Sequence, residues 1–88
     1  MEINGFNLIE TCGACPEQYD VMLGEKKVGY LRLRHGYFRA DYPGCGGRTV
    51  YEAYPEGDGI FAGYEERMLH LTEAVNAIER ALKGDSDE

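Results

Sequence analysis

The stretch VGYLRLRHGYFRADY, residues 28–42, decides the fold of this 88-residue chain. Its first half, residues 28–34, alternates leucines with tyrosine and arginines, and its second half, residues 37–42, alternates apolar and polar side chains in the same way. Alternation with a period of two is the pattern of a β-strand that buries one face. His35-Gly36 between the halves favours a tight turn. The stretch therefore predicts a β-hairpin with one buried and one open face.

Further strands are expected on both sides of this hairpin. Residues 18–24 alternate apolar and polar side chains and lead into a hairpin connection, and residues 48–54 follow a glycine-rich link. Residues 3–9 form a possible short first strand, which Asn4-Gly5 weakens. Short links make neighbouring strands antiparallel. We therefore expect a meander of four, possibly five, strands.

A helix is expected from about Tyr64 or Glu65 to Lys83, because apolar side chains recur there at steps of three and four residues. Gly84 stands where a left-handed C-terminal cap is expected. Residues 1–84 are expected to form a single domain, and residues 85–88 are expected to form a frayed acidic tail. The stripe consists of Met68, Leu71, Val75, Ile78 and Leu82.

The predicted fold class is α+β, an antiparallel sheet packed on one C-terminal helix. Because the helix has one apolar stripe, it covers one face of the sheet only. Leu31 and Leu33, with Val21 and Leu23, are expected beneath the helix. The opposite face is expected to carry Tyr30, Arg32, Arg34, Tyr37, Arg39 and Glu52.

The charge is unevenly distributed. The chain has a net charge of −7, yet residues 26–48 contain six basic side chains and one acidic side chain. Nucleic-acid binding depends on neutralising phosphates, so a globally acidic protein is not expected to bind nucleic acid directly. The local basic face, with Arg48 as a further member, could accept a small anion; the alternative is that a mixed surface only aids solubility.

Three cysteines raise the question of a metal. Cys12 and Cys15 stand in one glycine-containing turn and Cys45 in another, and His35 or His70 would supply the fourth zinc ligand. The second turn lacks a paired cysteine, so reduced thiols are the alternative to zinc. Redox catalysis is disfavoured because Pro16 and a strand, not a helix, follow the Cys-x-x-Cys pair.

The expected location is the cytoplasm. An odd number of cysteines fits a reducing interior, the first residues show no apolar signal core, and no stretch approaches the roughly 20 apolar residues of a membrane span.

Enzymatic function is the least favoured class. Ser86 is the single serine and no Gly-x-Ser-x-Gly turn exists, which excludes a serine nucleophile. His70 is expected as a solvated side chain at the helix flank. The loop of residues 44–49 could cradle an anion through its amides, but it lacks the Gly-Lys-Ser/Thr ending of a P-loop, so a flexible connection is the alternative.

Two resemblances add expectations. The strand GYLRL, residues 29–33, with its turn and second strand, resembles the central hairpin of GNAT-type acetyltransferases over residues 26–43. The coenzyme-A loop of that family is absent and the chain has roughly half the usual length, so no catalytic residue is carried over. Residues 16–20 and 28–36 are similar to small uncharacterised proteins of Firmicutes and their phages or mobile elements, which implies an accessory or anti-defence role.

The leading hypothesis is a non-enzymatic binding module. A protein partner or a small anionic ligand would bind the sheet face that the helix leaves uncovered. The residues expected to contact it are Tyr30, Arg32, Arg34, Tyr37, Arg39 and Arg48. A homodimer formed through the open face or a sheet edge is the second hypothesis. Mimicry of nucleic acid by the acidic surface is a third.

Overall fold

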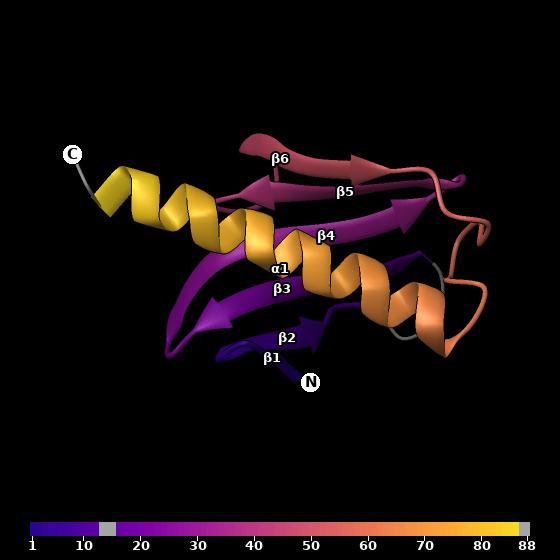
Figure 1. The fold of residues 1–88 in the computed structure, drawn as a ribbon, viewed down its shortest axis with the longest axis horizontal. Helices are drawn as coiled ribbons and strands as arrows, with labels where there is room; N and C mark the ends of the chain where they lie inside the picture. The colour runs from indigo at the N-terminus through magenta and orange to yellow at the C-terminus, as the bar shows by residue number, and fades with distance from the viewer. Residues whose placement is uncertain (13–15, 87–88) are drawn as a thin grey trace.

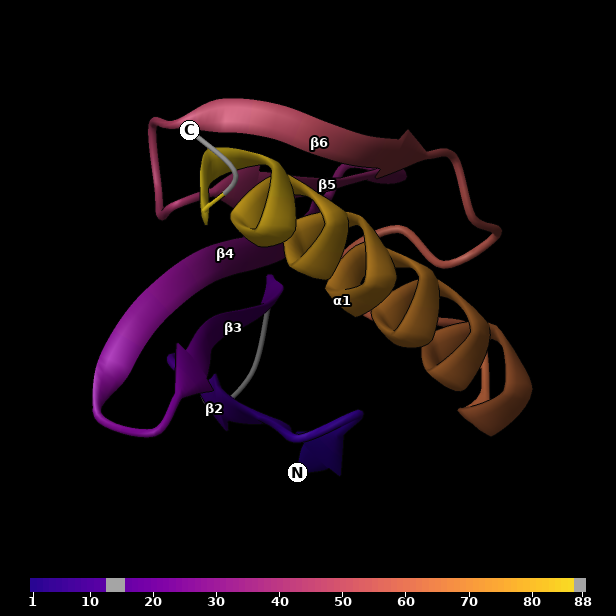
Figure 2. The same cartoon turned by 60° about the vertical axis from the view of Figure 1, so that its left-hand side comes forward.

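The computed structural model describes residues 1–12 and 16–86. They form one six-stranded sheet and a C-terminal helix that crosses one face of the sheet diagonally (Figures 1 and 2). The α+β class expected from the sequence is confirmed. The elements are β1 (Glu2–Ile3), β2 (Phe6–Glu10), β3 (Glu17–Leu23), β4 (Lys26–Arg34), β5 (Tyr37–Tyr42), β6 (Arg48–Ala53) and α1 (Tyr64–Ser86).

The sheet is a simple meander in which each strand pairs antiparallel with the next. It contains six strands, more than the four or five expected, because residues 3–9 do not form one strand. Asn4 and Gly5 both have positive φ angles, 53° and 86°. Two successive positive φ angles make the tight turn that joins β1 to β2. The dipeptide that weakened the strand prediction is therefore the hairpin turn itself.

The central hairpin has the predicted turn. His35 and Gly36 adopt φ angles of 54° and 73°, and the strands on either side pair so that Leu33 lies opposite Phe38. The amide of Gly36 donates a hydrogen bond to the carbonyl oxygen of Asp58 at 2.8 Å. The link between β6 and α1 therefore fixes the position of this turn.

The core lies between the sheet and α1. Leu31, Leu33 and Val21 are fully buried there, as expected, together with Phe38 and the apolar stripe of the helix. Leu23 was expected beside them but is 42% exposed. The β3–β4 ladder shifts register between Val21 and Met22 because β4 contains an extra residue, Val28, and Leu23 lies beyond this shift as the last residue of β3.

The helix does not end at Gly84. It continues to Ser86, so the predicted left-handed cap at Gly84 is wrong and two residues of the expected tail are helical, while residues 87–88 lie outside the described part of the chain. Over the described residues, no helix is both long and apolar enough to cross a membrane.

Glu17 is a buried carboxylate that ties the start of β3 to α1. It is 3% exposed and accepts hydrogen bonds from Arg67 Nε at 2.6 Å, from the amide of Phe61 at 3.1 Å and from the hydroxyl of Tyr19. Burial alone would raise the pKa of Glu17, but these hydrogen bonds outweigh it and hold the pKa below its ordinary value. The ionised form is therefore part of the folded structure.

Glu66, in the first turn of α1, organises the link before the helix. Its carboxylate accepts hydrogen bonds from the amides of Ala62 at 2.7 Å, Glu56 at 2.7 Å and Gly57 at 3.3 Å. These amides, that of Ala62 first, lower the pKa of Glu66. The irregular link thus has a defined course past the β4–β5 turn.

Candidate functional site

The face of the sheet away from α1, here called the open face, carries side chains in rows that run across the strands. Directly paired residues of neighbouring strands point to the same side of a sheet. The first row contains Arg34, Tyr37 and Tyr54; the second contains Gln18, Arg32, Arg39 and Glu52; the third contains Asp20, Tyr30, Asp41 and Thr49.

The second row places two like charges side by side. Arg32 lies directly opposite Arg39, an arrangement that is unfavourable without a counter-charge. Arg39 has one, since its Nε lies 3.1 Å from a carboxylate oxygen of Asp41. Within the part of the chain that the structure describes, neither Arg32 nor Arg34 forms an ion pair. Two guanidinium groups on this face therefore have unused donors.

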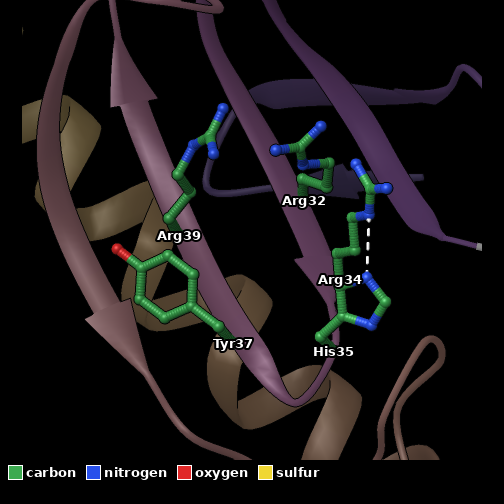
Figure 3. A pocket seen from close by; sticks show the side chains of 5 residues that line it. All are labelled: Arg32, Arg34, His35, Tyr37 and Arg39. Atoms are coloured by element: carbon green, nitrogen blue, oxygen red, sulfur yellow. Dashed lines mark hydrogen bonds between the residues drawn. The ribbon is translucent and has the colours of Figure 1, made fainter.

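These arginines surround a shallow hollow of about 360 Å³, lined by Arg32, Arg34, His35, Tyr37 and Arg39. Figure 3 shows the five side chains on the near side of β4 and β5, with the helix behind the strands. Arg34 Nε donates a hydrogen bond to Nε2 of His35 at 3.3 Å, so the imidazole holds one edge of that guanidinium. The whole lining comes from residues 32–39, the end of the hairpin that decides the fold.

Tyr37 is the tyrosine that lines the hollow, and its ring contacts that of Tyr54. Their ring centroids lie 5.4 Å apart, with the rings tilted by 39°. The hydroxyl of Tyr37 donates a hydrogen bond to Glu52 at 2.7 Å, and this bond raises the pKa of Tyr37. Tyr54, just beyond the end of β6, is 79% exposed. An aromatic pair with one freely accessible ring thus adjoins the arginines.

The third row is a supporting layer. Asp41 is 2% exposed and accepts hydrogen bonds from Arg39, from the hydroxyl of Thr49 at 3.0 Å and from the amide of Gly46 at 3.4 Å. Tyr30, expected as a binding residue, is buried in this row beneath Arg39, whose guanidinium carbon lies 6.0 Å from the ring centroid. Tyr30 and Asp41 therefore hold Arg39 in place, and neither of them lines the hollow.

Arg48 does not join the predicted group. It pairs with Tyr42, whose side chain belongs to the core on the helix side, and it is absent from the lining of the hollow. The β5–β6 ladder shifts register between Ala40 and Asp41. This irregularity places Arg48 on the opposite side of the sheet from Glu52.

His35 and Cys45, two of the proposed zinc ligands, do not lie together. His35 stands in the β4–β5 turn and Cys45 in the β5–β6 link, at opposite ends of β5. Cys12 is partly buried after β2, and Cys15 lies outside the described residues. No three His, Cys, Asp or Glu side chains of residues 1–12 and 16–86 gather closely enough to hold a metal ion.

His70, the alternative fourth ligand, is not the solvated side chain that we expected. Its ring stacks on Phe61, with centroids 5.8 Å apart, and its Nδ1 lies 2.9 Å from the hydroxyl of Tyr51. These contacts give His70 a packing role between α1 and β6.

A second hollow, of about 660 Å³, lies beside the glycine-rich loop of residues 43–47 and is also lined by Lys26 and Lys27. Lys27 is paired with Asp20 at 3.1 Å. The amides of Gly46 and Gly47 are already bonded within the protein. This hollow therefore offers an anion fewer unused donors than the hollow lined by Arg32, Arg34 and Arg39.

Sequence reasoning missed Tyr54 as a member of the site, although residues 48–54 were predicted as a strand. Alternation from Glu52 to Tyr54 is the signal that could have found it.

Searches against protein-family models, curated proteins and solved structures found no match to the chain.

Proposed function

We propose that this protein is a non-enzymatic binding module that takes an anionic ligand on its open face. The ligand's anionic group occupies the hollow between Arg32, Arg34 and Arg39, with Tyr37 at its side. The observation that carries the proposal is that, among residues 1–12 and 16–86, Arg32 and Arg34 form no ion pair, and Arg32 lies directly opposite Arg39. A bound anion would relieve the repulsion and use the free donors.

Several features favour binding of the ligand over its chemical conversion. Guanidinium groups present donors in a planar fork that matches carboxylate and phosphate oxygens. The hollow is lined by three arginines, a tyrosine and His35, and Nε2 of His35 already accepts a hydrogen bond from Arg34. In an accessory protein of a phage or mobile element, such a site would act by withholding its ligand.

The support beneath the arginines also favours a preformed site. Arg39 is held by Asp41 and by the ring of Tyr30, and Arg34 is held by His35. A charged side chain that is already oriented loses less conformational freedom when the ligand binds. The open face is therefore suited to recognition with little rearrangement.

Isothermal titration calorimetry with inorganic pyrophosphate at low ionic strength tests the proposal. Removing two charge-assisted donor groups with Arg32→Gln and Arg34→Gln together should raise Kd about tenfold or more. Arg80→Gln, which removes an exposed arginine of α1, is the matched control and should leave Kd unchanged.

The proposal is wrong if wild-type protein shows no saturable binding of pyrophosphate. It is equally wrong if the double variant, still folded by circular dichroism, binds as tightly as the wild type.

A further inference from the structure

We infer that the anionic ligand is a mononucleotide whose phosphate lies on the arginines and whose base stacks on Tyr54. The inference rests on the proposed function and names the ligand class for the same site. Its starting point is the first row, in which an arginine, a half-covered tyrosine and an exposed tyrosine follow one another on β4, on β5 and just beyond the end of β6.

The spacing of the first row suits such a ligand. Arg34 and Tyr54 stand two strands apart, and neighbouring strands are about 4.8 Å apart. Tyr37 lies between them, directly opposite Arg34 and in ring contact with Tyr54. A nucleotide joins a flat aromatic ring to a phosphate through one sugar, so the sugar would lie over Tyr37 while the two ends reach Tyr54 and the arginines.

Tyr54 is the residue that indicates a ligand with an aromatic ring. Its ring is 79% exposed, although the neighbouring Tyr37 is partly covered and hydrogen-bonded. Every nucleobase has a face that can stack on such a ring. An inorganic anion or a carboxylate of an acidic peptide would use the arginines and leave the aromatic pair without a partner.

Charge and size favour a mononucleotide over a nucleic-acid strand. The residues outside 26–48 carry fifteen acidic and three basic side chains, which would repel a long polyanion that extended beyond the hollow. The hollow of about 360 Å³ is at the lower end of the range for small-molecule sites.

The test compares AMP with ribose 5-phosphate, because AMP carries a base where ribose 5-phosphate carries its anomeric hydroxyl. Dissociation constants are measured by titration calorimetry for wild type, Tyr54→Ala and Tyr64→Ala. Tyr64 is a similarly exposed tyrosine, 73% exposed, at the start of α1, and its variant is the matched control.

We expect AMP to bind wild type and Tyr64→Ala about tenfold more tightly than ribose 5-phosphate, since stacking of one base on an aromatic side chain has about this effect. In Tyr54→Ala the two ligands should bind equally, with Kd for ribose 5-phosphate unchanged.

The outcomes separate this inference from the proposed function. Equal affinities of AMP and ribose 5-phosphate for the wild type, with pyrophosphate still bound through Arg32 and Arg34, would overturn the nucleotide assignment and leave the anion site standing. An AMP preference that persists in Tyr54→Ala would overturn it as well. If none of the phosphates binds, both proposals fail.

Discussion

Glu17 is a residue whose role depends on the fold and not on its neighbours in sequence. Two of its partners, Phe61 and Arg67, lie more than forty positions away, so no local pattern predicts them. In the sequence, Glu17 only precedes the strand expected over residues 18–24. The structure adds that its buried charge fastens β3 to the helix and to the link before it.

Replacing Glu17 by Gln should lower the free energy of unfolding at pH 7 by about 2–3 kcal/mol, because Arg67 loses its charged partner. The pKa of Glu17 is lower in the folded state than its ordinary value of 4.5. Its contribution to stability is therefore complete above about pH 4.5 and is lost as the pH falls through the folded-state pKa.

Urea unfolding from pH 7 to pH 3 measures this effect. The difference between wild type and Glu17→Gln should shrink as the pH falls below 4.5, whereas Glu25→Gln, a substitution in an exposed turn, should show little difference at any pH. A wild-type advantage that stays constant down to pH 3 would show that the Glu17 charge is not what stabilises the fold.

At the scale of elements, period-two alternation predicted the strands of the central hairpin and their faces because both strands pair without irregularity there. The same rule failed for Arg48 in β6, which contains the extra residue of its ladder, and Leu23, beyond the other shift, is exposed at the end of β3. A shift of one residue moves the following side chains to the other face. Gly29, an isolated glycine within β4, stands opposite Val21 at the first shift and is a sequence signal of a bulge.

The face assignment of β4 has a direct test. Leu33→Ala should lower the free energy of unfolding by about 2–5 kcal/mol because it leaves a cavity beneath α1. Arg32→Ala, on the open face, should change it by less than about 0.5 kcal/mol. Thermal or chemical unfolding of the two variants that gave the reverse ranking would contradict the register.

The candidate site was predicted in part. Arg32, Arg34, Tyr37 and Arg39 belong to one regular hairpin, so their common face followed from alternation. The turn residue His35 was expected only as a metal ligand, yet it lines the hollow beside Arg34. Tyr54 joins through a contact with Tyr37 between strands, which requires the register of β6 and not only its existence.

At the scale of the whole molecule, the fold concentrates a basic hairpin within an acidic chain. The helix occupies one face of the sheet, so the arginines of the hairpin remain on the other (Figure 3).

A homodimer stays a prediction of the sequence. The shortness of β1 and the register shift beside β6 are features that limit pairing at sheet edges.

The central claim is that this open face is where an anion binds. The most direct measurement is a titration of ¹⁵N-labelled protein with pyrophosphate, followed through its backbone amide signals. The account predicts saturable shifts concentrated in residues 32–39, which line the hollow. Shifts concentrated at Lys26, Lys27 and residues 44–47, around the second hollow, or no saturable shift at all, would contradict it.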